Sequence, residues 1–242
     1  VALITGGNGG IGLAFGKAMA EAGAQVMVAG RNPNKNGEAV KKIQSLGVEA
    51  DSLIVDITDP EACRAMVKDT VKRFGRLDIL VNNAGTAVRK QPQDISLDEF
   101  RMVIETNLTS AFVTSQAAYP EMLKAKGGKI INIGSMMSLF GAAFSSPYAS
   151  SKGGVIGMTL PMARDLADKG IRVMAIAPGI FGTPMVKSFP QEVQDALAAQ
   201  IPFPSRLGKP DEFAALVAHI AENPMLNGDV IRLDGAIRMP PR

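Results

Sequence analysis

Cysteine and histidine are scarce in this sequence. Among its 242 residues there is one cysteine, Cys63, and one histidine, His219. One cysteine cannot form an internal disulfide, and the two residues together are too few to build a Cys/His zinc cluster. We therefore expect a protein without a bound metal in a reducing compartment, the cytoplasm.

Long apolar runs and blocks of one charge are lacking too. No run reaches the length of a membrane span, and no signal or transit peptide is visible. The 26 Lys and Arg residues nearly balance the 23 Asp and Glu residues, without a basic run or an RNA-binding aromatic motif. We expect neither a membrane nor a nucleic acid as partner, whereas a net charge of +3 suits a phosphorylated small ligand. The chain starts inside a strand-like run, VALIT, so we also expect a missing upstream segment.

The composition, 46% hydrophobic and 20% charged, is ordinary for a globular protein with one large core. Segments of helical length with amphipathic spacing, such as 61–74 and 99–110, alternate with apolar runs. This alternation is typical of right-handed βαβ crossovers. It predicts an α/β fold, a doubly wound (Rossmann) parallel sheet with helices on both faces, in a single domain over residues 1–242. The expected strands cover residues 1–5, 25–29, 52–55, 79–82, 129–133, 172–177 and 230–233.

One segment departs from this alternation. Residues 180–210 are rich in Phe and Pro and contain a short helix-like run, PQEVQDALAAQ. In a doubly wound fold, ligands bind at the carboxyl ends of the strands. We therefore expect this long excursion after the sixth strand to form a lid over the substrate.

A glycine-rich loop joins the first strand to an amphipathic helix. The run TGGNGGIG, residues 5–12, places Gly6, Gly10 and Gly12 where a tight turn would bring the backbone close to a pyrophosphate. A flexible turn is the alternative interpretation. The flanking strand and helix favour dinucleotide binding, because the fingerprint requires both.

The end of the second strand bears on the choice of coenzyme. An acidic residue there accepts a hydrogen bond from the ribose of NAD, whereas a nearby arginine accommodates the 2′-phosphate of NADP. This sequence has Gly30 followed by Arg31. We expect NADP(H) to be preferred, with NAD(H) possible, unless Arg31 is only a solvated loop residue.

A tyrosine and a lysine four residues apart, Tyr148 and Lys152, begin a predicted helix. Residues at i and i+4 lie on one face of a helix. A nearby ammonium stabilises a phenolate and lowers the pKa of tyrosine from about 10 towards neutral pH. The pair therefore predicts acid/base catalysis. A solvated surface pair is the alternative.

With these motifs, essentially the whole chain resembles the classical short-chain dehydrogenase/reductases, through TGGNGGIG, NNAG (82–85), ETNLTSAF, NIGSMMS, YASSK (148–152) and PGIFGT (178–183). The resemblance implies a catalytic tetrad of Asn107, Ser135, Tyr148 and Lys152. Tyr148 would exchange the proton, Ser135 would orient the substrate oxygen, Lys152 would lower the pKa of Tyr148 and hold the nicotinamide ribose, and Asn107 would support a relay water.

The same resemblance implies the coenzyme contacts. Asp56 would meet the adenine ring, and Thr183 would meet the carboxamide. The full set is Gly6, Asn8, Gly10, Ile11, Gly12, Arg31, Asp56, Ile57, Asn83, Ala84, Gly85, Tyr148, Lys152, Pro178, Gly179 and Thr183. The family also implies a homotetramer, with the last strand and the helix before it at one interface.

Two positions depart from the family pattern. Gly9 stands where NADP-preferring members often carry a basic residue, which leaves Arg31 without its usual partner. Pro161 falls within the helix after Lys152, where a proline costs about 3 kcal/mol and causes a kink unless packing compensates.

The two parts of the chain resemble different branches of the family. From Ser151 onward the sequence is similar to type 2 3-hydroxyacyl-CoA dehydrogenases, whereas the part before it resembles gluconate 5-dehydrogenases and related keto-sugar acid enzymes. The mosaic is either natural divergence or a recombined sequence.

The expected pocket favours an apolar substrate, a 3-hydroxyacyl or 3-oxoacyl thioester or another hydroxy or keto compound. Its apolar side chains would be Met136, Met137, Leu139, Phe140, Met185, Phe189 and Phe203. A keto-sugar acid is the alternative, with Arg206 or Lys187 to hold its carboxylate.

Two functions of other classes are weaker alternatives. A serine hydrolase would use Ser135 and His219 with an aspartate, but Ser135 lacks the G-x-S-x-G elbow. A cofactor-binding protein without turnover would not need an intact tetrad.

Overall fold

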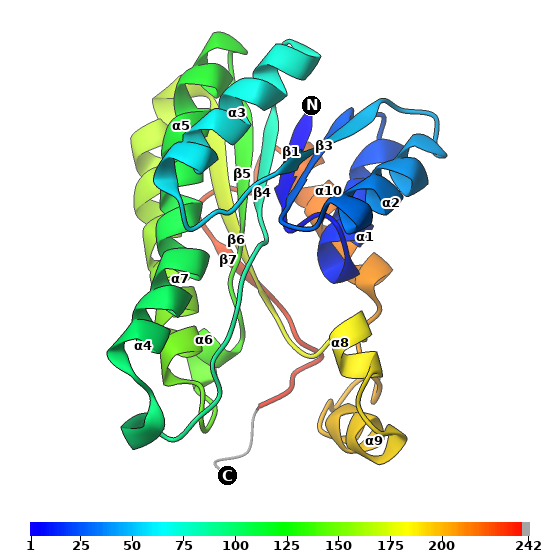
Figure 1. Cartoon of the computed structure of the whole chain (residues 1–242), viewed down its shortest axis with the longest axis vertical. Helices are drawn as coiled ribbons and strands as arrows, with labels where there is room; N and C mark the ends of the chain where they lie inside the picture. The colour runs from blue at the N-terminus through cyan, green and yellow to red at the C-terminus, as the bar shows by residue number, and fades with distance from the viewer. Residues whose placement is uncertain (239–242) are drawn as a thin grey trace.

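A parallel sheet of seven strands forms the centre of the protein (Figure 1). In the computed structural model, which describes residues 1–238 apart from the side chain of Met185, the strand order is β3-β2-β1-β4-β5-β6-β7. This is the predicted doubly wound topology. The strands are β1 (Ala2–Thr5), β2 (Val26–Gly30), β3 (Ala50–Ile54), β4 (Ile79–Asn82), β5 (Gly128–Ile133), β6 (Ile171–Pro178) and β7 (Val230–Leu233).

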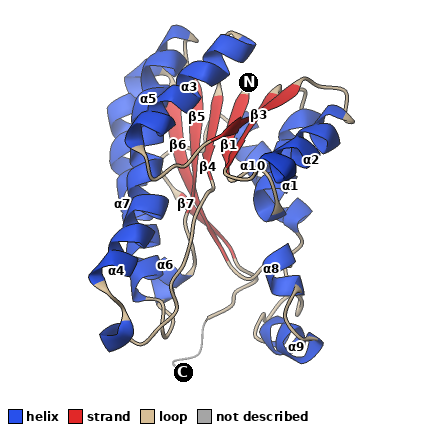
Figure 2. Ribbon diagram, viewed as in Figure 1, coloured by secondary structure: helices blue, strands red, loops and turns tan. Residues whose placement is uncertain are grey.

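Helices cover both faces of the sheet, as predicted (Figure 2). One layer contains α1 (Gly10–Glu21), α2 (Pro33–Gln44) and α10 (Pro210–Glu222). The other contains α3 (Pro60–Phe74), α5 (Ser110–Lys124) and α7 (Ser146–Leu166). Shorter helices are α4 (Leu97–Ile104), α6 (Met137–Phe140), α8 (Pro184–Lys187) and α9 (Gln191–Ala199), with single turns at η1 (Pro92–Asp94), η2 (Glu105–Thr109) and η3 (Ala167–Lys169).

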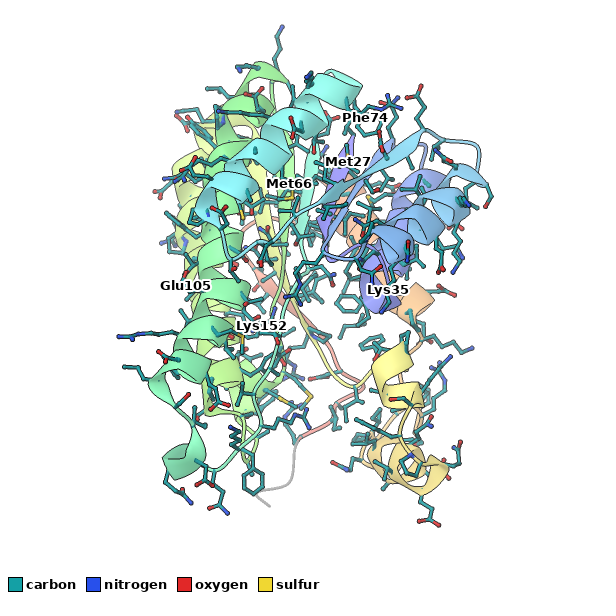
Figure 3. All side chains as sticks on the ribbon, in the orientation of Figure 1. Met27, Lys35, Met66, Phe74, Glu105 and Lys152 are labelled. Carbon is teal, nitrogen blue, oxygen red and sulfur yellow. The ribbon has the colours of Figure 1, made fainter. Side chains whose placement is uncertain are left out.

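Each layer encloses its own hydrophobic core. Under α1 and α10, the rings of Phe15 and Phe213 meet edge to face with centroids 4.8 Å apart. Under α3 and α5, Met66 packs with Met27 and Leu80 from the strands; Figure 3 labels both methionines. The inner strands β1, β2 and β4 are covered on both faces and are almost entirely apolar, whereas the edge strands β3 and β7 are only partly buried.

The strand order reverses between β1 and β4, which are paired in parallel. The chain leaves the carboxyl ends of these two strands towards opposite faces of the sheet, and this point of reversal is the usual ligand site of such folds. The predicted glycine-rich loop follows β1, and the NNAG segment ends β4.

Two helices continue through a proline, where a break or kink is expected. Helix α7 continues through Pro161, and α5 continues through Pro120. Within residues 1–238, no helix is both long and apolar enough to cross a membrane.

The 180–210 segment lies at the carboxyl end of the sheet (Figure 1). Its first residues pack on the layer of α1 and α10, where the rings of Phe181 and Phe213 lie 5.0 Å apart. It contains α8 and α9, and α9 has no buried residue. Phe189 is 41% exposed and Phe203 is 80% exposed, so they do not form the inward-facing apolar wall that the sequence suggested. The side chain of Met185, a third member of that expected wall, lies outside the described residues.

Candidate active site

The glycine-rich loop forms a cradle at the end of β1. Gly6 and Gly10 have φ values of +64° and +52°, which side-chain-bearing residues rarely adopt. A Cβ at Gly12 would overlap the backbone oxygen of Gly6 and lie 2.6 Å from Asn83 Nδ2. At Gly9 a Cβ would meet nothing within 4 Å, so this side of the loop is open. A closely packed base and an open rim fit a pyrophosphate at the start of α1, which includes the predicted contact Ile11.

The loop after β4 is tied to this cradle. Asn83 Nδ2 donates to the backbone oxygens of Thr5 and Gly6 at 3.0 and 3.2 Å. In return, Thr5 Oγ1 accepts from the backbone N–H groups of Asn83 and Ala84. The structure therefore brings the predicted contacts at positions 83 and 84 to the glycine-rich loop.

The loop after β6 closes the third side of the cradle. A Cβ at Gly10 would lie 3.6 Å from Pro184 Cδ and 4.0 Å from Thr183 Cβ. The predicted contacts Pro178 and Gly179 end β6, where the N–H of Gly179 donates to the oxygen of Leu233 at 2.9 Å.

The adenosine side of the expected coenzyme site carries Arg31 and Asp56. Arg31 is exposed and makes no hydrogen bond or ion pair with another described residue. Hydrogen bonds from the backbone and hydroxyl of Thr58 hold the pKa of Asp56 below its usual value, and the charge of Arg31 acts in the same direction. Ile57 packs against the core under α3.

Asn107 occupies the π-helical turn η2 and is buried, with 2% of its surface exposed. Its Oδ1 accepts from the N–H of Thr86 at 2.7 Å, and its Nδ2 donates to the oxygen of Thr86 and to Ser151 Oγ at 2.8 and 2.9 Å. Asn107 thus fixes the loop after β4 to helix α7. Both amide hydrogens are used in this way.

Lys152 extends from α7 towards the sheet and is 3% exposed (Figure 3). Its Nζ donates to the backbone oxygen of Ile133 at 2.6 Å. Burial lowers the pKa of Lys152 to about 8. A Cβ at Gly85 would lie 3.2 Å from Asn107 Oδ1 and 3.5 Å from Lys152 Nζ, so these three predicted residues meet at one point.

Ser135 and Tyr148 form the other half of the predicted tetrad. Ser135, at the end of β5, is buried and accepts a hydrogen bond from the N–H of Met137 at 3.1 Å. Burial raises the pKa of Tyr148, while a hydrogen bond with Ser135 and the charge of Arg89 act in the opposite direction.

The expected lowering of the Tyr148 pKa by Lys152 is therefore not found. The Lys152 ammonium bonds to the carbonyl of Ile133, and its burial disfavours its own charge. The cation that acts on the phenol is Arg89, in the loop after β4, which the sequence analysis missed. A positive residue four positions after the NNAG motif was the only available signal.

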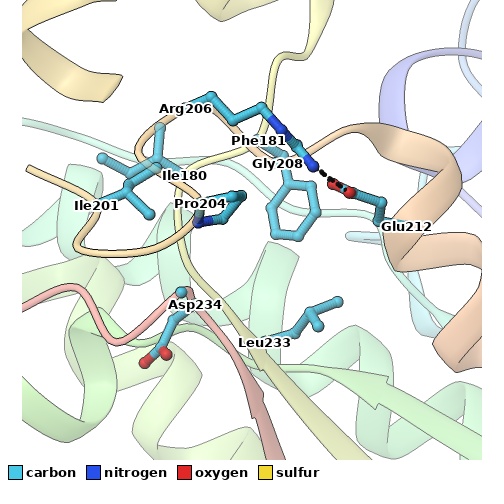
Figure 4. A pocket seen from close by; sticks show the side chains of 10 residues that line it. Ile180, Phe181, Ile201, Pro204, Arg206, Gly208, Glu212, Leu233 and Asp234 are labelled. Carbon is cyan, nitrogen blue, oxygen red and sulfur yellow. Dashed lines mark hydrogen bonds and ion pairs between the residues drawn. The ribbon is translucent and has the colours of Figure 1, made fainter. Parts of the chain in front are cut away.

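A cavity of about 260 Å³ lies at the base of the 180–210 segment (Figure 4). None of the four predicted catalytic residues lines it. Arg206, at its rim, makes two hydrogen bonds to the carboxylate of Glu212. This arginine, one of the two cations expected to hold a sugar acid, is thus already paired. The other lining residues are Ile180, Phe181, Ile201, Pro204, Gly208, Leu233, Asp234 and Gly235.

The hydrolase arrangement is not formed. His219 lies in the last turn of α10, with Nε2 3.2 Å from Asn223 Nδ2. Ser135 Oγ instead accepts a hydrogen bond from the N–H of Met137. Among the described residues, no group of three or more His, Cys, Asp or Glu side chains is placed to hold a metal.

Comparison with known proteins identifies the class. The model of the short chain dehydrogenase family matches residues 1–194. The chain therefore belongs to the short-chain dehydrogenase/reductase family, and it is an oxidoreductase. Members of this family use NAD(H) or NADP(H).

Particular relatives extend over the whole chain. It is 45% identical to human 3-hydroxyacyl-CoA dehydrogenase type-2 over 254 residues, covering 100% of this chain and 96% of the relative. It is 38% identical to the Vibrio cholerae 3-oxoacyl-[acyl-carrier-protein] reductase FabG, with 99% and 97% covered. A 7α-hydroxysteroid dehydrogenase solved with NADH and 7-oxo glycochenodeoxycholic acid superimposes with a TM-score of 0.93 at 34% identity, over 100% of this chain and 95% of that one.

Proposed function

We propose that the protein interconverts 3-hydroxyacyl and 3-oxoacyl thioesters, or related apolar hydroxy and keto compounds, with NADP(H) preferred. The observation that carries this proposal is the meeting of Asn107, Lys152 and Gly85 beside the Ser135–Tyr148 pair, next to the glycine cradle. The hydroxyacyl and oxoacyl relatives, similar over the whole chain, support the substrate class.

Tyr148 is the proton donor during reduction and the proton acceptor during oxidation. Ser135 acts against the effect of burial on the pKa of the phenol, and its hydroxyl would hold the substrate oxygen beside Tyr148. The nicotinamide coenzyme, when bound, supplies or accepts the hydride. Tyr148 then needs only to move one proton between its hydroxyl and the substrate oxygen.

Lys152 would supply a positive charge near this proton transfer, and Asn107 would fix the neighbouring loop. Since the pKa of Lys152 is about 8, its ammonium form predominates at neutral pH. One N–H is taken by the oxygen of Ile133, which leaves two to bind a ribose. Asn107 keeps the loop after β4 against α7, so that Gly85 stays beside Lys152.

The coenzyme would lie along the three loops that surround the glycine cradle. Gly6, Gly10 and Gly12 would border the pyrophosphate, Asn8 would lie towards the adenosine ribose, and Thr183 would lie at the nicotinamide end. At the adenosine end, Arg31 is unpaired among the described residues and follows Gly30, which carries no acidic group. This combination supports the preference for NADP(H).

We also propose a domain organisation, an assembly and a compartment for the protein. The chain would act as one domain in which residues 180–210 close over the substrate. It would assemble as a homotetramer in the cytoplasm, with β7 and α10 at one interface. Light scattering that gave a monomer at working concentration would contradict the tetramer.

The test is the loss of NADPH absorbance with acetoacetyl-CoA, with NADH measured in parallel. We expect turnover with the thioester and a lower KM for NADPH than for NADH. No turnover of the thioester by protein that binds NADPH would reject the substrate class.

A keto-sugar acid is the second candidate, favoured by one observation. Arg89 has no hydrogen bond or ion pair with another described residue, yet its charge reaches Tyr148. A cation without an ion-pair partner among the described residues, whose charge acts on the reacting hydroxyl, could hold a substrate carboxylate. Turnover of 5-ketogluconate in the same assay, lost in Arg89→Gln but not in Lys187→Gln, would favour this candidate.

A further inference from the structure

Asn36 is a buried amide that joins three segments at the carboxyl end of the sheet. It lies in the first turns of α2 with 1% of its surface exposed. Its Nδ2 donates to the backbone oxygen of Gly30 at 3.0 Å and to that of Leu53 at 3.1 Å. Its Oδ1 accepts from Asn8 Nδ2 at 2.7 Å. One side chain therefore connects the ends of β2 and β3 to the glycine-rich loop.

These bonds fix the orientation of both amides. Both hydrogens of Asn36 Nδ2 point at carbonyl oxygens, so Asn36 Oδ1 can only accept. Asn8 must then turn its own Nδ2 towards Asn36. One N–H of Asn8 is used in this bond, and the second is left for another partner.

Gly30 provides the space for this network. Its φ lies outside the left-handed region, so the backbone alone would accept a side chain there. A Cβ at position 30, however, would overlap Asn8 Nδ2 and lie 2.8 Å from Asn36 Oδ1. A side chain at position 30 is therefore excluded unless Asn8 and Asn36 move and lose their hydrogen bonds.

We infer that Asn36 is a positioning residue for coenzyme choice. Together with Asn8 it fills the space that an acidic side chain at position 30 would need, which keeps the end of β2 without negative charge. It also directs one N–H of Asn8 to where a phosphate oxygen can accept it. In this arrangement Asn8 takes the place of the basic residue that is missing at Gly9. Asn8 and Arg31 would then hold the 2′-phosphate together.

The inference rests on the proposed NADP(H) preference and deepens it. It makes a prediction that Gly30 alone does not: an acidic residue at position 30 cannot create an NAD site while Asn36 is present. Asn36→Ala would release Asn8 to turn away, and only then would Gly30→Asp find room.

The experiment measures binding by titration calorimetry rather than turnover. The ligands are NADP⁺, NAD⁺, 2′,5′-ADP and 5′-AMP, and the last two report on the 2′-phosphate alone. The variants are Asn36→Ala, Asn8→Ala, Gly30→Asp and Gly30→Asp/Asn36→Ala, with thermal unfolding recorded for each. Asn32→Ala is the matched control, because the Asn32 side chain caps the same helix through Lys35 N–H and makes no hydrogen bond to Asn8 or Asn36, while its backbone oxygen, which accepts from Asn36 N–H, is kept in the variant.

We expect Asn36→Ala and Asn8→Ala to weaken 2′,5′-ADP binding about tenfold, the size of one hydrogen bond to a charged group, with 5′-AMP unchanged. Gly30→Asp should bind both coenzymes poorly, and the double variant should bind NAD⁺ about tenfold more tightly than Gly30→Asp. Asn32→Ala should lower the melting temperature and leave the preference intact.

Three results would overturn the inference. The first is an unchanged preference in folded Asn36→Ala, or in Asn8→Ala where Asn36→Ala does not fold. The second is a Gly30→Asp protein that binds NAD⁺ as tightly as the double variant. Both leave the proposed preference standing. The third is a wild-type protein that binds NAD⁺ as tightly as NADP⁺, which would reject the proposed preference and the inference together.

Discussion

The carboxyl edge of the sheet around Asn107 and Lys152, here called the catalytic edge, differs from the 180–210 segment in how far its side chains are buried. At the catalytic edge, Asn107 and Lys152 are 2% and 3% exposed, and both bond to backbone atoms of neighbouring segments. In the 180–210 segment, α9 buries no residue and Phe203 is 80% exposed.

This difference separates two tasks. Buried groups with several hydrogen bonds keep one geometry, which proton transfer requires. An exposed segment with few internal contacts is drawn from the least stable part of a fold and can move or change at little cost. We therefore assign the reaction to the edge and the selection of substrate to the segment.

The largest expected effect comes from the edge. Tyr148→Phe removes the exchanged proton but keeps the ring, so kcat should fall by about 10² to 10⁴. Coenzyme affinity and the melting temperature should stay close to the wild-type values. Steady-state kinetics with acetoacetyl-CoA and a thermal melt check this, and a variant as active as the parent would remove Tyr148 from the mechanism.

Asn107→Ala should damage the edge through stability. It leaves the N–H and oxygen of Thr86 without their buried partner, which costs about 1–3 kcal/mol of unfolding free energy. Urea unfolding measures the loss. Thr106→Ala is the control, because the hydroxyl of Thr106 bonds only to the oxygen of Met102 in its own helix. An equal loss of unfolding free energy in both variants would show that the bonds of Asn107 between the loop after β4 and α7 add no particular stability.

Arg89→Gln should shift a pH profile. The positive charge of Arg89 lowers the pKa of Tyr148, so its removal raises that pKa. Oxidation needs the phenolate, and the rise of kcat/KM with pH should move to higher pH by less than about one unit. Lys90→Gln changes the same charge one residue away, but Lys90 is paired with Glu99 and should leave the profile in place. A shift to lower pH in Arg89→Gln would contradict the account.

The smallest effect is expected at the base of the 180–210 segment. The hydrogen bonds from Arg206 lower the pKa of Glu212 from 4.5 to about 2, so the pair stabilises the fold above pH 4.5 and loses its effect as pH falls towards 2. Because the pair is exposed, Glu212→Gln should lower the melting temperature at neutral pH by less than about 4 °C. The difference should shrink in high salt and at low pH. A larger loss that salt does not change would mean that the segment is held more firmly than we infer.

The inner strands were predictable from the sequence because they are buried on both faces and therefore mostly apolar. The predicted bounds agree with the structure for β4 and β7 and lie within about two residues of it for the other strands. The order of the motifs also predicted the tetrad, and its catalytic role stays a prediction. These signals are local in the chain.

The contacts that set the chemistry were not predictable. Lys152 bonds to Ile133 because of tertiary packing, and Asn36 bonds to Gly30 and Leu53 for the same reason. The sequence positions of these residues do not indicate that they are hydrogen-bonded. The expected inward orientation of Phe189 and Phe203 failed for the same reason: an apolar side chain in a long loop is buried only if another element covers it.

The most direct test of this division of tasks is the kinetics of Phe203→Ser with acetoacetyl-CoA. Met225→Ser is the control, because Met225 is 89% exposed but lies outside the segment. We predict that Phe203→Ser raises KM several-fold while kcat stays within about twofold of the parent, and that Met225→Ser changes neither. A fall in kcat with unchanged KM would place Phe203 in the reaction itself and contradict the separation of catalysis from selection.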